Sequence, residues 1–442
     1  MDKELQGLWN KGAFSDEPAP PDRKPVKTRY VYKIKHKANG SVERYKARLV
    51  ARGFTQQQGL DFFQTFGPVF GLDVMRSVLA TAAHHGWATH SLDFTQAYLN
   101  ASLQEDIWLE IPDGNIIKAN KALYGLKQSA LQWYKELRST IPGEGWSSSA
   151  NDECLYYRRS KDGRVAVLLT YVDDTAFTGD YGEEIKRMWD TLLSTYEGRD
   201  LGVPDQLLGV RIATDETGII LDQQLYTKSI VTEGMGSLDL RITTSPLDPG
   251  ELDCKLYPYA NILGKLMFLV GMTRPDLASS VWELGRHAAS PCMRHWRGLQ
   301  HVLRYLTGTL DVCIHYAANT DSNDEQVLIG YSDSDWGNDI ETRRSVTGYI
   351  LLYDGLPIAW RSKQQGAVTL SSAAAEWTAM AQGMRHCIVL CNILGEIDVP
   401  QQATPWFGDN RGALQAATTT GLSGRTKHVD MKLKCTREYM EH

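Results

Sequence analysis

The chain has 442 residues, of which 42% are hydrophobic and 23% are charged, and this balance predicts globular material forming roughly three domains. Its formal net charge of -6 argues against nucleic-acid binding by the surface as a whole, although local clusters of charge matter more than the sum. The longest apolar stretch, Ile262 to Met272, is interrupted by Lys265 and is too short to span a bilayer, and the N-terminus has no apolar leader, so we expect a soluble, non-secreted protein. The seven cysteines include no C-x-x-C pair, which predicts reduced thiols rather than a zinc module or a disulfide framework.

A strongly basic segment lies between Arg23 and Arg52. It carries eleven Lys and Arg residues and a single acidic residue, Glu43. Charged and apolar residues alternate on both sides of Asn39-Gly40, which predicts a β-hairpin. Such a hairpin suits contact with a phosphate backbone or a triphosphate, and the alternative is a solvated sheet edge whose lysines prevent aggregation.

Two adjacent carboxylates follow a strand-like run further along the chain. The run Val165 to Thr170 is rich in β-branched and aliphatic residues, the segment Thr175 to Thr178 can return beside it, and Asp173 and Asp174 fall at the hairpin end. Crowded carboxylates repel each other unless a cation lies between them, and hard oxygen ligands at a rigid turn suit Mg²⁺. An Asp-Asp pair is also common in solvated turns, so both interpretations stay open on this motif alone.

The pattern becomes helical from Asp222 to about Tyr316. The predicted helical segments are Tyr226 to Thr232, Tyr257 to Val270, Asp276 to Ala289 and Met293 to Leu306. Between two of them, Thr273-Arg274-Pro275-Asp276 predicts a proline turn in which Asp276 caps the following helix. The polar stretch Ala317 to Gln326 is the best linker candidate.

Four basic residues share one face of the last helical segment, spaced by three, four and three positions: Arg294, Arg297, His301 and Arg304. The other face is apolar. An amphipathic helix with a cationic face is the type of element that follows a duplex backbone without reading its sequence. A solvated polar face is the alternative interpretation.

After the linker, four acidic residues lie at the ends of predicted strands or the starts of predicted helices: Asp333, Glu376, Asp409 and Asp430. Either Ser371 or Ser372 can cap the long helix that contains Glu376. Isolated acids are usually solvated, but acids placed at one edge of a sheet can converge on a metal ion.

Seven blocks of sequence occur in one order along nearly the whole chain: Arg44 to Phe54, Leu92 to Leu99, Leu123 to Gln128, Tyr171 to Asp174, Thr273 to Asp276, Gly330 to Trp336 and Ser371 to Glu376. Together they resemble the reverse transcriptase and ribonuclease H portion of a copia-type LTR-retrotransposon polyprotein. The resemblance implies an α+β fold class, a right-hand polymerase of fingers, palm and thumb followed by an α/β ribonuclease H-like domain. The implied domains are fingers and palm over 1–222 (palm mainly 86–112 and 155–222), a helical thumb or connection with linker over 223–325, and ribonuclease H over 326–442.

The resemblance implies that Asp93 joins Asp173 and Asp174 as the polymerase metal ligands. Two ions are expected in each active site, Mg²⁺ with Mn²⁺ as the alternative. Because successive residues of a regular strand point to opposite faces, we expect Asp93 and Asp173 to bridge both ions and Asp174 to be more peripheral.

The resemblance also implies a nucleotide pocket. Tyr98 matches the family's aromatic residue that lies under the incoming sugar and excludes a 2′-hydroxyl. Lys46 and Arg48 are candidates for gripping the triphosphate, and the choice between them is open because the hairpin register is unknown. Tyr124 and Gly125 would line the pocket, with glycine allowing a close backbone approach.

Two other positions bear on the implied polymerase. Leu208-Gly209 matches the place of the primer grip. Ala130 stands where the family usually has proline, which leaves the local loop shape open more than the chemistry.

For the C-terminal domain the resemblance assigns Asp333, Glu376, Asp409 and Asp430 as the ribonuclease H carboxylates around two Mg²⁺ ions. Asp335 competes with Asp333 for the first role, but the predicted strand ends at Asp333. His428 is expected either to aid product release or proton transfer, or only to order the last helix.

The implied function is an RNA-directed DNA polymerase with a fused ribonuclease H that copies retrotransposon RNA into DNA. Its implied partners are an RNA template, a DNA primer, an RNA–DNA hybrid, dNTPs and other parts of the same polyprotein, with a homodimer left open and no membrane partner. The implied location is intracellular, in a cytoplasmic retrotransposon particle. The alternative is a catalytically silent nucleic-acid-binding or assembly module. Decay would be expected to remove at least one acid, and all seven candidates are present.

Overall fold

The computed structural model describes residues 2–36, 42–236, 257–318, 327–337, 339 and 342–410. The chain divides into two compact units, one formed by Met1–Phe70 with Thr89–Val203 and the other by Gly71–Ala88 with Pro204–His442. Both units combine helices and strands, so the prediction of a mixed α and β chain is confirmed. Gly71–Ala88 and residues 204–222, which were predicted to belong to fingers and palm, group with the C-terminal part, and the three-domain division stays a prediction.

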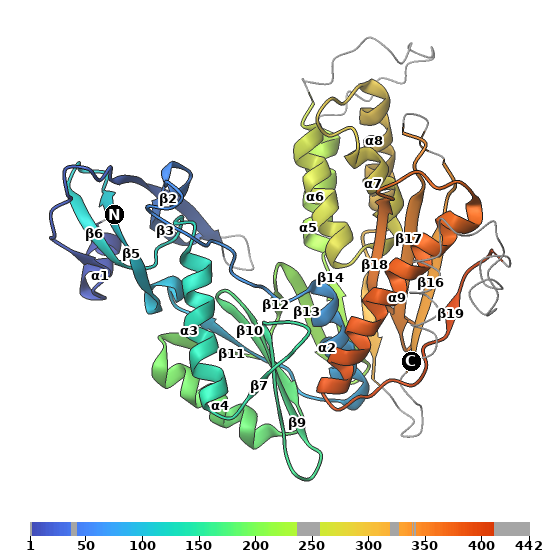
Figure 1. Cartoon of the computed structure of the whole chain (residues 1–442), viewed down its shortest axis with the longest axis horizontal. Helices are drawn as coiled ribbons and strands as arrows, with labels where there is room; N and C mark the ends of the chain where they lie inside the picture. The colour runs from blue at the N-terminus through green and yellow to red at the C-terminus, as the bar shows by residue number, and fades with distance from the viewer. Residues whose placement is uncertain are drawn as a thin grey trace. The chain divides into compact units, whose positions relative to one another are not determined.

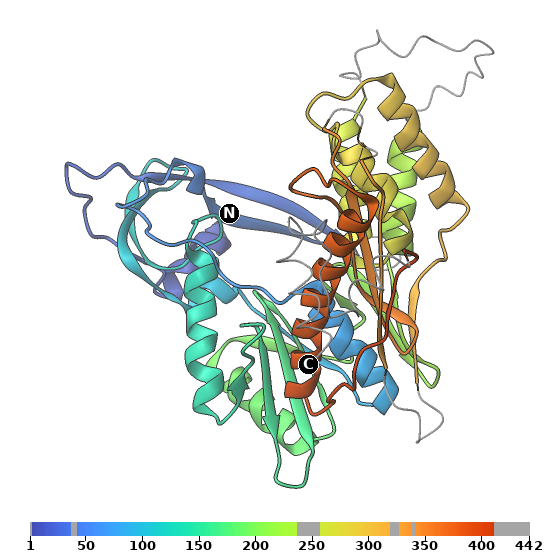
Figure 2. The same ribbon diagram turned by 45° about the vertical axis from the view of Figure 1, so that its right-hand side comes forward.

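The first unit contains a five-stranded sheet in the order β1-β6-β5-β2-β3. Its strands are β1 Phe14–Ser15, β2 Val26–His36, β3 Val42–Ala51, β5 Ser102–Glu110 and β6 Ile116–Lys121, and the helix α1 spans Asp2–Asn10. The predicted basic hairpin is β2 with β3, and its turn, residues 37–41, lies outside the described residues. Since β2 pairs with β5 only at Val26 and Lys27, most of the hairpin extends from the sheet as a two-stranded ribbon (Figure 2).

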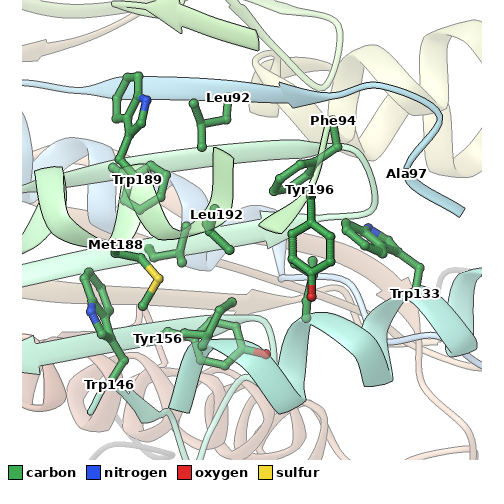
Figure 3. Close-up of a cluster of buried hydrophobic side chains, with 14 of the residues drawn as sticks. Leu92, Phe94, Ala97, Trp133, Trp146, Tyr156, Met188, Trp189, Leu192 and Tyr196 are labelled. Carbon is green, nitrogen blue, oxygen red and sulfur yellow. The ribbon is translucent and has the colours of Figure 1, made fainter. Parts of the chain in front are cut away.

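The same unit contains a six-stranded sheet in the order β11-β4-β10-β9-β8-β7. Its strands are β4 His90–Phe94, β7 Ser147–Ser148, β8 Leu155–Arg159, β9 Val165–Tyr171, β10 Asp174–Gly179 and β11 Gly198–Gly202, with helices α3 Ser129–Gly143 and α4 Gly182–Thr195 and the short turns η1 Gly53–Thr55 and η2 Ala97–Asn100. Trp133 of α3 and Met188 of α4 meet Leu92 and Phe94 of β4 in one buried cluster, so both helices cover one face of the sheet (Figure 3). Because side chains alternate along a strand, Asp93 lies on the opposite face.

The second unit combines a helical bundle with a four-stranded sheet (Figure 1). The bundle consists of α5 Gln224–Gly236, α6 Tyr259–Met272, α7 Ala278–Gly285 and α8 Met293–Thr307, and the sheet of β12 Gln206–Leu207, β13 Val210–Asp215, β14 Gly218–Asp222 and β15 Ile314–Ala317. Leu266, Trp296 and Leu303 are among the buried residues that join the helices. Where the structure describes them, the predicted helical segments are helical. None of the described helices has both the length and the apolar character that crossing a bilayer requires.

The role predicted for Asp276 is wrong. Asp276 lies inside the short helix η4 Pro275–Leu277, and Arg274 stands at its N-cap position. The buried Arg274 guanidinium instead donates to the Asp276 carboxylate at 2.7 and 2.9 Å and to the carbonyl of Thr309 at 2.9 Å. The acid is therefore held as the counter-charge of a buried arginine.

A second four-stranded sheet, in the order β18-β17-β16-β19, ends the described chain. Its elements are β16 Leu328–Ser334, β17 Val346–Tyr353, β18 Leu356–Gln364, β19 Trp406–Phe407 and the helix α9 Ser372–Glu396. Ser371 caps α9, since its hydroxyl accepts the backbone N–H of Ala374 at 3.2 Å. The parallel pairing of β16 with β19 places the carboxyl ends of both strands at one edge of the sheet.

The helix α2, Leu72–His85, is held within the second unit by a buried arginine. The Arg76 guanidinium donates to the carbonyls of Ile358 at 2.6 Å and Gly271 at 2.7 Å, and it lies 3.9 Å from the ring centre of Trp360. These contacts explain why a segment near the start of the chain belongs to the C-terminal unit. The five cysteines within the described ranges are free thiols.

Candidate active sites

The turn between β9 and β10 carries the two adjacent carboxylates. Tyr171 pairs with Asp174 across the hairpin, so Val172 and Asp173 form a two-residue turn. Val172 has a φ of 53°, which a β-branched residue rarely adopts and which costs on the order of 1–3 kcal/mol. The indole N–H of the buried Trp133 donates to the Val172 carbonyl. Core packing therefore helps to hold a strained turn.

Three neighbouring strands place charged residues side by side. Asp93 of β4 lies directly opposite Asp174 of β10 on one side and Arg199 of β11 on the other. Directly opposed residues of an antiparallel pair share one face of the sheet. Arg199 Nη2 donates to Asp93 Oδ2 at 2.8 Å. The sheet thus aligns carboxylate, carboxylate and guanidinium in a row next to the Asp173 turn.

The prediction that Asp173 bridges both metal ions while Asp174 is more peripheral rested on strand alternation. That reasoning is wrong because Asp173 lies in the turn. Asp174, expected to be peripheral, is the direct neighbour of Asp93. Burial, followed by the charges of Asp173 and Asp93, raises the pKa of Asp174 to about 6. Which acids bridge the ions stays a prediction.

The donor set of this site suits a hard divalent cation. Asp93, Asp173 and Asp174 offer carboxylate oxygens, the ligands that Mg²⁺ prefers. Among the described residues, however, their oxygens do not all lie within 4.8 Å of one another. The Asp93 carboxylate is instead hydrogen-bonded to Arg199.

An aromatic pair lies beside the turn. The ring centres of Tyr98 and Tyr124 are 4.6 Å apart, and the Arg48 guanidinium lies 4.2 Å from the ring centre of Tyr124. The Tyr124 hydroxyl donates to Asp173 Oδ2 at 3.5 Å. Burial, followed by the Asp173 charge, raises the pKa of both tyrosines, so both hydroxyls stay protonated.

The hairpin register bears on the open choice between Lys46 and Arg48. Arg48 reaches the aromatic pair, and Lys46 lies two residues earlier on β3. The side chain of Lys46 lies outside what the structure describes. The geometry favours Arg48 as a pocket residue, and the role of Lys46 stays a prediction.

Gly125 makes the close backbone approach that was predicted, but its partner is β3. Its φ is 93°, and a Cβ there would lie 2.2 Å from the carbonyl oxygen of Ala51. The Ala51 N–H donates to the Tyr124 carbonyl at 2.9 Å. The following loop is fixed by the buried Gln128, whose amide donates to the carbonyl of Asp61 at 2.8 Å. Glycine therefore lets the Tyr124 loop pack directly against the strand that carries Arg48.

A second group of carboxylates lies in the other unit. Asp333 on β16, Glu376 near the start of α9 and Asp409 after β19 each offer an oxygen, and these oxygens all lie within 4.8 Å of one another. Glu376 is buried, and Asp333 and Asp409 are exposed. Burial and repulsion from Asp333 and Asp409 raise the pKa of Glu376 to about 7, against a hydrogen bond of 3.3 Å from the Ser334 N–H. Three converging, mutually repelling carboxylates fit a divalent cation.

Asp335 has a different partner. Its Oδ1 accepts the backbone N–H of Val346, the first residue of β17, at 2.6 Å. This bond ties Asp335 to the neighbouring strand and favours Asp333 as the cluster member, as predicted. The remaining predictions for this site, Asp430 and His428, lie outside the described residues.

The predicted cationic face of α8 is exposed. The apolar face buries Trp296, Leu299, Val302, Leu303 and Leu306. The basic residues on the solvent side are Arg294, Arg297, His301 and Arg304. Leu208 and Gly209 form the turn between β12 and β13, with φ of 52° and 80°. Whether the basic face of α8 or the Leu208–Gly209 turn contacts nucleic acid stays a prediction.

Comparison with known proteins identifies the family of the chain. The family described as "Reverse transcriptase (RNA-dependent DNA polymerase)" matches residues 14–245, which is more than half of the chain. The chain belongs to the reverse transcriptase family. The matched region includes Asp93, Asp173 and Asp174, and the resemblance to a reverse transcriptase inferred from sequence is confirmed.

Retrovirus-related Pol polyproteins of plant transposons are similar to this reverse transcriptase. TNT 1-94 of Nicotiana tabacum is 31% identical over 464 residues, covering 100% of the chain and 35% of the polyprotein. RE2 of Arabidopsis thaliana is 33% identical over 436 residues, covering 93% and 29%, and RE1 of the same plant is 32% identical over 450 residues, covering 97% and 30%. The chain spans about a third of the length of these curated relatives.

The sequence analysis did not identify two residues that contact the first candidate site. Trp133 belongs to a helical pattern that predicts only core packing, and its bond to the Val172 carbonyl depends on the fold. Arg199 is 106 residues from Asp93, and only the register of the edge strand β11 brings the two together. No local pattern in the sequence identifies either contact.

Proposed function

We propose that this reverse transcriptase is an RNA-directed DNA polymerase with a fused ribonuclease H, which copies retrotransposon RNA into DNA. In this proposal the first unit supplies fingers and palm, the bundle α5 to α8 supplies the thumb, and β16 to β19 with α9 form the ribonuclease H domain. The observation that carries the proposal is the row of Asp93 and Asp174 beside the Asp173 turn and its aromatic pair.

In the polymerase reaction the primer 3′-oxygen attacks the α-phosphorus of a dNTP. One P–O bond forms, the bond to pyrophosphate breaks, and the hydroxyl proton is lost. Asp93, Asp173 and Asp174 would hold divalent ions, which when bound supply the Lewis acidity that activates the hydroxyl and offsets charge on the pyrophosphate. Tyr98 would support the sugar, and Arg48 would offer its planar fork to the triphosphate.

In the ribonuclease reaction water attacks an RNA phosphodiester of a hybrid, one P–O bond forms, and the 3′-oxygen of the preceding nucleotide leaves. Asp333, Glu376 and Asp409, with Asp430, would hold the metal ions. Because neighbouring acids raise the pKa of Glu376 to about 7, a bound cation would stabilise the fully ionised cluster.

The partners in this proposal are the RNA template, the DNA primer, the hybrid and dNTPs. The relatives are Pol polyproteins, so other parts of such a polyprotein are further proposed partners, within a cytoplasmic retrotransposon particle. The exposed basic face of α8 would contact the phosphate backbone.

The test is extension of a DNA primer on an RNA template by the purified chain. The wild-type chain should incorporate dNTPs with Mg²⁺ and not with EDTA, and Asp173→Asn should reduce extension to background. Asp162→Asn is the matched control, because Asp162 is an exposed aspartate that pairs with Arg164 at 2.9 Å, away from the turn. Extension that persists in Asp173→Asn would contradict the assigned site.

A further inference from the structure

Arg199 is joined to a candidate metal ligand by both backbone register and side-chain contact. It is the direct partner of Asp93 across β4 and β11, and its Nη2 donates to Asp93 Oδ2 at 2.8 Å. On the other side of Asp93 lies Asp174, so the guanidinium ends a row of two carboxylates. This places a fixed positive charge at the edge of the site.

Stabilising the fold does not account for this pair. The side chain of Arg199 is 61% exposed and that of Asp93 is 33% exposed, and exposed ion pairs contribute little to stability because water and salt screen them. The strand β11 is already held by its backbone pairing with β4 from Gly198 to Gly202.

The bond does affect what Asp93 can offer to a cation. It occupies Oδ2 and restricts rotation of the carboxylate, while Oδ1 is left as the other ligand oxygen. The guanidinium also places a positive charge beside a carboxylate whose other neighbour across the sheet is the carboxylate of Asp174. Carboxylates that ligate metals are commonly held by such hydrogen bonds, and loss of the partner typically costs about 10- to 100-fold in metal affinity or activity.

We propose that Arg199 is a positioning residue that orients the Asp93 carboxylate for divalent-cation binding at the polymerase site. The inference rests on the proposed function, because it needs Asp93 to be a metal ligand. A lysine ammonium is a point charge on a flexible stem, whereas a guanidinium holds its donors in a fixed plane, so lysine should replace arginine only in part.

The experiment measures Mn²⁺ binding to the full chain by electron paramagnetic resonance. The background carries Asp333→Asn and Glu376→Gln, which weaken the second carboxylate cluster. In this background Arg199→Ala should weaken Mn²⁺ binding by about 10- to 100-fold, and Arg199→Lys should fall between. Arg164→Ala is the matched control, because Arg164 is also exposed and pairs with Asp162 and Glu183 at the other end of β9, and it should leave Mn²⁺ binding unchanged. Thermal unfolding of each variant shows that the fold is retained.

Asp93→Asn separates failure of the inference from failure of the proposed function. If Asp93→Asn leaves Mn²⁺ affinity unchanged, the metal site itself is wrong, and the inference falls with it. If Asp93→Asn weakens binding while Arg199→Ala binds as well as or more tightly than the background, the site stands and the positioning role is overturned. In that case Arg199 only competes with the cation for the Asp93 carboxylate.

Discussion

Substitution of Gly125 by alanine should damage both stability and nucleotide binding. The φ of 93° costs an alanine about 1–2 kcal/mol. The added Cβ would also lie 2.2 Å from the Ala51 carbonyl oxygen, and relieving such overpacking typically costs about 1–3 kcal/mol more. The expected loss in the free energy of unfolding is therefore about 2–5 kcal/mol. Because the loop carries Tyr124 against the strand of Arg48, the KM for dNTP should rise.

Gly114 provides the matched control. Its φ of 90° is nearly the same, but a Cβ there meets nothing within 4 Å. Gly114→Ala should therefore lose only about 1–2 kcal/mol and keep the wild-type KM. Denaturant unfolding and primer-extension kinetics of the two variants test the reasoning. The claim that Gly125 positions the pocket would be refuted if Gly125→Ala and Gly114→Ala lost the same free energy of unfolding and Gly125→Ala kept the wild-type KM for dNTP.

Three further predictions concern charge, selectivity and nucleic-acid contact. The folded pKa of Glu376, about 7, exceeds its unfolded value of 4.5, so the folded state binds the extra proton and stability in EDTA should fall as pH rises from about 4.5 to 7. Glu376→Gln should flatten this fall. If the melting temperature of Glu376→Gln depends on pH as that of the wild-type chain does, Glu376 is not the group responsible. Tyr98→Ala should increase ribonucleotide incorporation by about 10-fold or more, whereas Tyr98→Phe should preserve discrimination, as competing dNTP and rNTP incorporation would show. Arg297→Ala and Arg304→Ala should each lower the salt slope of hybrid binding by about 1, and an unchanged slope would mean a merely solvated face.

Local patterns predicted the parts of the structure that depend on neighbouring residues. The basic hairpin follows from alternation around a two-residue turn signal, and the helix that presents Glu376 follows from its apolar stripe and serine cap. Asp333 lies next to the last residue of β16 and Asp409 lies just after β19, and these parallel strands end at one edge of the sheet, so their convergence with Glu376 could also be predicted.

Long-range pairing accounts for what the sequence did not predict. Arg76 is buried in the second unit because it meets the Ile358 carbonyl, 282 residues away. The Arg199 contact requires the register of an edge strand. The position of Asp174 opposite Asp93 was not predicted, because the turn at Val172 interrupts the alternation on which the prediction relied. None of these features has a local sequence signal.

One assay tests most directly the claim that synthesis and cleavage use separate carboxylate sites. A labelled RNA template annealed to a labelled DNA primer reports both reactions of the purified chain at once. Asp173→Asn should abolish extension and leave cleavage of a preformed hybrid, and Glu376→Gln should abolish cleavage and leave extension. Loss of both activities in either folded variant, or retention of the targeted activity, would contradict the account.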